Sequence, residues 1–105
     1  MNYKTTFILM MLLSLKAQSN EHFKIDTLGS SKAGQFVALE EYGYKSLTHS
    51  YVVTIKILNV WTREYVGKEI EVEEPALNPQ RLSQARAKAK SLAKEDLERF
   101  KILDS

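Results

Sequence analysis

Two periodicities divide this chain at Asn78 and Pro79. Before this point, apolar and polar side chains alternate along residues 51–61, a pattern typical of a strand with one buried face. After it, apolar side chains recur about every 3.6 residues, as in an amphipathic helix. The strand face comprises Val53, Ile55 and Ile57, and the helix stripe comprises Leu82, Ala85, Ala89, Leu92, Ala93, Leu97 and Phe100. We therefore predict an α+β fold in which one long C-terminal helix covers a small antiparallel sheet.

Other strands are predicted on both sides of this central one. Residues 36–42 are rich in strand-forming side chains and lie between the turn-forming segment 29–34 and Gly43. Residues 23–25 could add a strand at the N-terminal side. The upstream part of the sheet therefore contains one or two strands.

A shorter strand is predicted after the central one. In it, Ile70 and Val72 point to one face, and the glutamates at positions 69, 71 and 73 point to the other, which should be solvated. Hairpin-type loops are expected around residues 45–49 and 62–68. The sheet should thus have three to four strands within residues 22–74, in a blade-like arrangement.

The C-terminal helix is predicted to span about residues 79–101. Asn78 is a good N-cap, and Pro79 suits the first helical position because its missing N–H is not needed there. Lys and Arg flank the apolar stripe, so the basic edges are either solvated or face the acidic strand 69–73. The alternative, that this basic amphipathic helix contacts an anionic membrane, is not favoured because the mature chain is formally neutral.

The N-terminal residues have the pattern of a secretory signal peptide. Lys4 precedes a continuous apolar run over residues 7–15, and a small-residue pattern follows at residues 17–19. This run is about half of the roughly 20 residues that a membrane-spanning helix needs. We predict a signal peptide over residues 1–19 and one small domain over residues 20–105, secreted or periplasmic. Lys16, just after the run, leaves open whether the signal is cleaved or anchors the chain.

Cysteine is absent from the chain, which excludes disulfides, thiolate metal ligands and N-terminal lipidation on cysteine. Lys4 and Lys16 are two of the 15 Lys and Arg residues, so 13 remain in the mature chain against 13 Asp and Glu. Residues 20–76 are acidic and residues 77–101 are basic. Nucleic-acid binding is not expected, because the basic excess is small and few aromatic residues accompany it.

The sequence shows no catalytic, cofactor-binding or metal-binding constellation. The two histidines, His22 and His49, are far apart and lack other ligands at metal-binding spacing. Neighbouring strand residues point to opposite faces, so His49 and Ser50 do not form a nucleophile pair. We therefore expect that the protein is not an enzyme and has no cofactor.

Glu40 and Glu41 also point to opposite faces of their strand. One of them should face inward or toward an inter-strand partner, and the sequence does not say which. A buried carboxylate needs a donor, such as Lys56 or Arg63. We expect the role of this residue to be structural.

The segment from Ser31 to Leu39 resembles the blade motif of TolB-type β-propellers, in which a Ser-x-Asp-Gly turn precedes a strand ending in small and then large apolar residues. Ala33 stands where that motif has Asp. With Glu40-Glu41-Tyr42-Gly43, Tyr51-Val52-Val53-Thr54-Ile55, Asn59-Val60-Trp61 and the helix after Leu82, residues 28–100 resemble a bacterial family of predicted secreted proteins of unknown function. Members of that family continue into further strands, so the resemblance implies that this chain corresponds to their N-terminal portion. It also implies export, and no catalytic residue.

Three functional hypotheses remain. The first is an exported, non-catalytic binding module of the bacterial cell envelope, whose partner is an envelope protein or polymer. Its binding surface would use aromatic residues at strand ends, which give large contact areas at low entropic cost. These residues are Tyr42, Tyr44, Tyr51 and Trp61. The second is a fragment of a larger secreted protein without independent activity, and the third is an envelope hydrolase that pairs Glu40 or Glu41 with His49.

Overall fold

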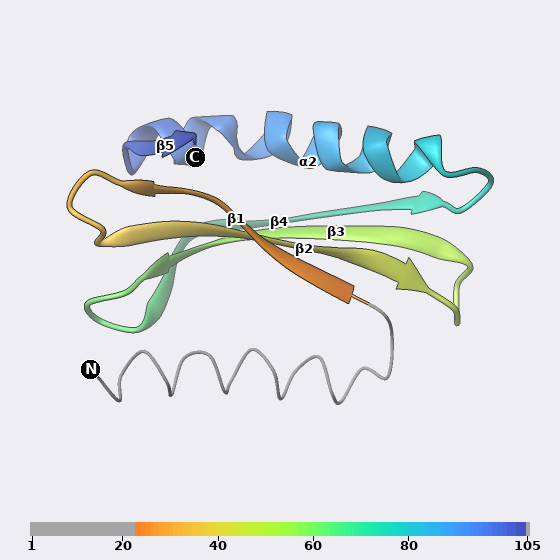
Figure 1. The fold of residues 1–105 in the computed structure, drawn as a ribbon, viewed down its shortest axis with the longest axis horizontal. Coiled ribbons are helices and arrows are strands. Elements are labelled where there is room, and N and C mark those ends of the chain that lie inside the picture. The colour runs from red at the N-terminus through yellow and green to blue at the C-terminus, as the bar shows by residue number, and fades with distance from the viewer. Residues whose placement is uncertain (1–22, 105) are drawn as a thin grey trace.

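The structure, a computed structural model, describes residues 23–104. Its elements are β1 (Phe23–Ser31), β2 (Phe36–Lys45), β3 (Ser50–Asn59), β4 (Glu64–Pro75), α2 (Gln80–Arg99) and β5 (Ile102–Asp104). The five strands form one antiparallel sheet in the order β4-β3-β2-β1-β5, and α2 lies along one face of it (Figure 1). The predicted α+β fold is confirmed. The short strand β5, which follows the helix and returns to β1, was not predicted.

The predicted signal peptide at residues 1–19 and His22 lie outside the described residues. Within residues 23–104, no helix is both long enough and apolar enough to cross a membrane.

The four long strands follow one another through three short turns, so each pairs with its neighbour in the chain. The strands extend further than the apolar pattern indicated. The predicted turn at 29–34 is wrong in its first half, because β1 continues to Ser31. The loop predicted at 62–68 is also wrong beyond its first two residues, because β4 already begins at Glu64.

A bulge in β4 interrupts the alternation of side chains, so the sequence pattern does not reveal where this strand begins. Ile55 pairs with Ile70, whereas Ile57 pairs with Val66, so β4 has two more residues than β3 between these pairs. Gly67 lies in the bulge with a φ of 72°, a left-handed conformation that glycine adopts without strain. The alternation of side chains is therefore interrupted where the strand itself continues.

The core lies between α2 and the face of the sheet that the helix covers. Side chains of β3 and β4 pack there against alanines of the helix, whose small side chains let the helix approach the sheet closely. Its buried members are Val53, Ile55, Ile70, Val72, Ala85, Ala89 and Ala93. The predicted inward faces of β3 and β4 are thus confirmed, and the glutamates at 69, 71 and 73 are exposed as expected.

The helix differs from the prediction in two details. Leu92, which was assigned to the apolar stripe, is 54% exposed, because the contact with the sheet is narrower than the stripe. The predicted side-chain cap from Asn78 is absent at the start of α2, where Pro79 is the N-cap residue with helical φ and ψ of −61° and −27°. Asn78 instead accepts a hydrogen bond through its backbone carbonyl from the Arg81 N–H at 3.1 Å.

Polar contacts near the two ends of α2 fix its position on the sheet. Near the N-terminal end, the Arg81 guanidinium lies 3.7 Å from the Glu74 carboxylate. Near the C-terminal end, the Lys68 backbone N–H in the β4 bulge donates to the Asp96 carboxylate at 2.7 Å. The helix packs mainly on β4 and β3, so the same face of the sheet is less covered over β2 and β1.

Candidate functional site

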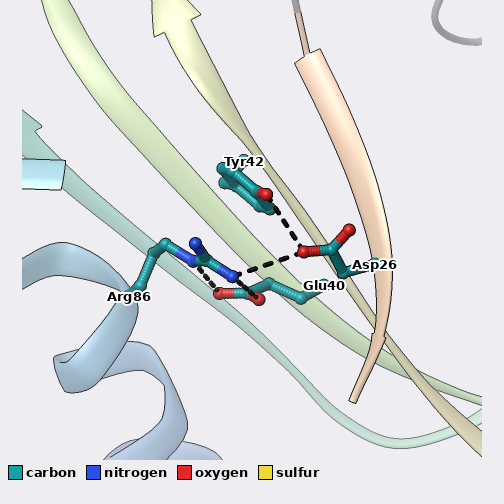
Figure 2. Close-up of polar contacts among 4 residues, drawn as sticks. All are labelled: Asp26, Glu40, Tyr42 and Arg86. Atoms are coloured by element: carbon teal, nitrogen blue, oxygen red, sulfur yellow. Dashed lines mark hydrogen bonds and ion pairs between the residues drawn. The ribbon is translucent and has the colours of Figure 1, made fainter. Parts of the chain in front are cut away.

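Four polar side chains meet beside the helix, over β1 and β2 (Figure 2). We call Asp26, Glu40, Tyr42 and Arg86 the arginine cluster. Arg86 donates to both carboxylate oxygens of Glu40, from Nε at 3.0 Å and from Nη2 at 2.9 Å. Nη2 also lies 3.4 Å from Oδ2 of Asp26, and the Tyr42 hydroxyl donates to that same oxygen at 3.0 Å. The cluster therefore joins one helix and two strands through a continuous set of polar contacts.

The electrostatics of the arginine cluster follow mainly from its hydrogen bonds. The Glu40 side chain is fully buried, whereas the Arg86 side chain keeps 32% of its surface exposed. The hydrogen bonds to Glu40 raise the pKa of Arg86, since they favour its charged form. The guanidinium also lies over the Tyr42 ring, 3.9 Å from its centroid. The hydrogen bond to Asp26, followed by burial, raises the pKa of Tyr42.

The arginine cluster shows which of the adjacent Glu40 and Glu41 faces inward. Glu40 lies on the helix-covered face, and Glu41 lies on the opposite face of β2. The predicted donors are wrong, because the donor is Arg86. Lys56 lies instead with its Nζ 5.2 Å from the centroid of the Tyr65 ring.

Arg86 is the residue of this cluster that the sequence analysis missed. It is one of the basic residues beside the apolar stripe that were expected either to be solvated or to face the acidic strand 69–73. A usable signal was present, because Arg86 follows the buried Ala85 directly and lies one helical turn after Leu82, at the border of the stripe. A strand glutamate among apolar neighbours, together with an arginine at such a border, is the pattern to search for.

A second group of side chains lies at the turn between β2 and β3. Tyr44 and Tyr51 are directly paired across these strands, and their rings meet edge to face at 6.1 Å. The Tyr44 hydroxyl and Nδ1 of His49 are hydrogen-bonded at 2.9 Å. His49 has a φ of 51°, which turns the chain back into β3. These bonds and ring contacts hold the three side chains in defined positions at the surface.

Two exposed leucines lie in the segments that adjoin these rings. Leu47, in the same turn, is 85% exposed, and Leu77, in the connection from β4 to α2, is 71% exposed. The two segments are joined, because the Ala76 N–H donates to the His49 carbonyl at 3.0 Å. We call Tyr44, Leu47, His49, Tyr51 and Leu77 the hairpin-end patch. The sequence analysis missed both leucines, although an apolar side chain in a polar turn was a visible signal.

The four aromatic residues singled out in the sequence do not form one surface. Tyr42 lies on the same face as Tyr44 and Tyr51 but belongs to the arginine cluster. Trp61 is 61% exposed in the turn between β3 and β4, at the other end of β3 from Tyr51. Ten strand residues span about 33 Å, so Trp61 is remote from the other three.

The structure does not bring together the acid and base of the hypothetical hydrolase. Glu40 is bonded to Arg86 and His49 to Tyr44, and Glu41 lies on the face opposite to Glu40. Ser50 donates to the Glu73 carboxylate rather than to His49. Among residues 23–104, no group of three His, Cys, Asp or Glu side chains is arranged to hold a metal ion.

Ser50 has a defined electrostatic effect on its acceptor. Its hydroxyl bond, with a smaller contribution from Thr48, holds the pKa of Glu73 below its usual value. Ser50 is buried and its hydroxyl lies 2.5 Å from that of Thr48, so the three residues form a short polar chain on the side of the sheet away from α2. This chain stabilises the turn that carries the hairpin-end patch.

Comparison of the sequence with protein-family models and with curated proteins, and of the structure with solved structures, finds no match.

Proposed function

We propose that this protein is an exported, non-catalytic binding module, and that it binds a protein of the bacterial cell envelope through the hairpin-end patch. The observation that supports the proposal is the exposure of Leu47 and Leu77 in the segments that adjoin the paired Tyr44 and Tyr51 rings. The export part rests on the signal-peptide pattern of the N-terminal residues.

The patch has the composition of a protein contact. Burying an exposed leucine side chain is favourable by about 1.5–3 kcal/mol, so two of them give a partner a substantial gain. The tyrosines add large contact areas and lose little entropy, because hydrogen bonding and ring packing already restrict them. An envelope polymer of sugars would use the rings and hydroxyls but would gain little from the two leucines. The exposed leucines therefore favour a protein partner.

Site-specific photo-crosslinking in the producing cell tests this function. A photoreactive amino acid at Leu47 and, separately, at Leu77 is expected to yield an adduct with the same envelope protein. Leu92 is the matched control, because it is a leucine with a comparable exposed fraction of 54% but lies on α2, away from the patch. Adducts from Leu92 of equal yield, or none from Leu47 and Leu77, would contradict the proposal.

Two further measurements separate the parts of the proposal. Cell fractionation and N-terminal sequencing are expected to find the protein outside the cytoplasm, starting at Asn20. Co-sedimentation with purified cell-wall sacculi is expected to retain no more wild-type protein than a Leu47→Ser/Leu77→Ser variant. Strong retention of the wild type alone would identify a polymer as the ligand instead.

A further inference from the structure

The sheet has an open edge along the first half of β1. Its other neighbour, β5, pairs only with Gly29, Ser30 and Ser31. No described strand pairs with the outer edge of residues 23–27, which we call the β1 window. Unpaired N–H and C=O groups of such an edge can accept a further strand.

We propose that the β1 window pairs antiparallel with the β1 window of a second copy of this chain, with Ile25 opposite Ile25. This contact makes a two-fold symmetric dimer with one continuous sheet across the interface. It goes beyond the proposed function, since it uses an edge of the sheet and not the hairpin-end patch.

Charge complementarity selects this register. Lys24 and Asp26 lie on the helix side of the sheet, because they pair with Tyr42 and Glu40 of β2. When Ile25 faces its own copy, Lys24 of each chain lies opposite Asp26 of the other, which gives two favourable cross-strand pairs. A register centred on Lys24 places two lysines opposite each other, and one centred on Asp26 places two aspartates opposite each other. Both alternatives juxtapose like charges and pair fewer residues of the window.

The cluster described above leaves Asp26 able to accept a second cation. Both of its contacts, from Tyr42 and from Arg86, use Oδ2. Figure 2 shows the other carboxylate oxygen directed away from Arg86, and the side chain keeps 49% of its surface exposed. The carboxylate thus has a free side on which the ammonium group of Lys24 from the second copy can bind.

The opposite side of the window is apolar. Phe23 and Ile25 lie on the face of the sheet away from α2, because they pair with Gly43 and Glu41 of β2. Both side chains are half-buried. In the proposed register, Ile25 packs on Ile25 of the second copy, and Phe23 lies opposite Thr27. Each β1 window therefore joins an apolar row on one face to alternating charges on the other.

The surrounding structure permits the contact and limits its length. The helix lies mainly over β4 and β3, two or more strands away, so it leaves the window accessible. The bulge between Thr27 and Gly29 ends the regular part of β1, and β5 occupies the edge beyond it. A second copy can therefore pair along five residues, which is the extent over which the charges match.

Sedimentation equilibrium of the purified full-length protein over a range of concentrations tests the dimer. The wild type is expected to be a dimer that Lys24→Glu weakens by at least about tenfold, because both charge pairs then become repulsive. Lys32→Glu is the matched control, since it makes the same charge change at an exposed turn position outside the window, and it should leave the dimer unchanged. A wild type that stays monomeric, or equal effects of the two variants, would overturn the proposal.

Disulfide formation tests the register independently. The chain has no cysteine, so a single introduced cysteine reports on one position. Under oxidising conditions, Ile25→Cys is expected to form a covalent dimer, because residues directly opposite in an antiparallel pair have Cβ atoms about 5 Å apart. Thr27→Cys should form no disulfide-linked dimer, since residue 27 of one chain and residue 27 of the other are separated by about 13 Å along the strands. Crosslinking of Thr27→Cys but not of Ile25→Cys would show that the proposed register is wrong.

Discussion

Arg86 donates two hydrogen bonds to Glu40, whose side chain has no exposed surface, and so fixes the middle of α2 to the second strand of the sheet. Within residues 23–104, Arg86 is the basic side chain that contacts the buried Glu40 carboxylate. The contribution of Arg86 to stability is therefore larger than its own partial burial suggests, since removing it leaves a buried carboxylate without its counter-charge.

The first prediction concerns this pair. Arg86→Ala should lower the free energy of unfolding by about 3 kcal/mol, because the Glu40 carboxylate is left unpaired in the interior. Arg81→Ala, which removes an ion pair at 3.7 Å between more exposed side chains, should cost about 0.5 kcal/mol or less. Replacing both Glu40 and Arg86 by leucine should cost less than Arg86→Ala alone. Urea unfolding monitored by circular dichroism measures all three, and equal losses for Arg86→Ala and Arg81→Ala would refute the account.

The second prediction concerns the bulge of β4. A Cβ atom on Gly67 would lie 2.8 Å from Oδ2 of Asp96 and 3.1 Å from Cε2 of Phe100, at a φ of 72°. Gly67→Ala should therefore combine backbone strain with a displaced helix contact. Gly34→Ala is the control, since its φ is 77° but a Cβ there has nothing within 4 Å. We expect Gly67→Ala to be more destabilising than Gly34→Ala by about 1–2 kcal/mol in thermal or urea unfolding. Equal losses of stability in the two variants would mean that backbone strain alone, and not the contact with Asp96 and Phe100, causes the effect.

The third prediction concerns acid stability. The pKa of Glu73 is lower in the folded protein than its ordinary value of 4.5, chiefly because Ser50 donates a hydrogen bond to the carboxylate. The folded state then holds fewer protons than the unfolded state, so this contribution is complete above pH 4.5 and is lost as the pH falls through the lower, folded value. In Ser50→Ala, the stability lost between pH 6 and pH 3 should be smaller than in the wild type. Urea midpoints across this range measure it, with Ser83→Ala on the exposed side of α2 as the control.

The fourth prediction concerns Tyr42 at alkaline pH. Its pKa is raised above the ordinary 10.0, first by the hydrogen bond to Asp26 and then by burial. The folded state therefore keeps the phenol proton longer, and the associated stability is present below pH 10 and is lost as the pH rises through the folded value. Carbon-13 NMR titration of the tyrosine ring should show a lower pKa for Tyr42 in Asp26→Ala, where Arg86 remains. An unchanged titration in that variant, or the same change in Glu69→Ala, would argue against this cause.

The parts of the fold that were predictable are those where one side-chain periodicity persists. Ile55 and Ile70 were placed inward correctly because alternation alone determines the face of a strand residue. The bulge at Gly67 interrupted the alternation, so the first half of β4 was interpreted as a loop. The strand β5 is three residues long, which is too short for any periodicity to be visible.

The candidate sites were less predictable for a different reason. Alternation showed that Glu40 and Glu41 face opposite sides, but which side is covered depends on the position of α2, a tertiary contact. The partner Arg86 is 46 residues away in the chain, and local patterns do not report such distances. Tyr44 and Tyr51 meet because the turn between them sets the register of β2 and β3, whereas Trp61 is carried to the other end of β3 by the same strand.

The row of alanines on α2 affects how the alignment of the helix on the sheet is determined. Methyl groups along Ala85, Ala89 and Ala93 offer few protrusions to interlock with the Val and Ile side chains of the sheet, and the larger Leu82 and Leu97 pack against the same core. The contact of these three alanines therefore supplies attraction with little directional information. Arg86 and Asp96 add that information, because they bind fixed groups on β2 and β4 and lie about 2.8 helical turns apart, and two separated points are enough to define a line. A chain with the same alanines but without these two anchors would keep its helix and its sheet and lose much of what aligns one with the other.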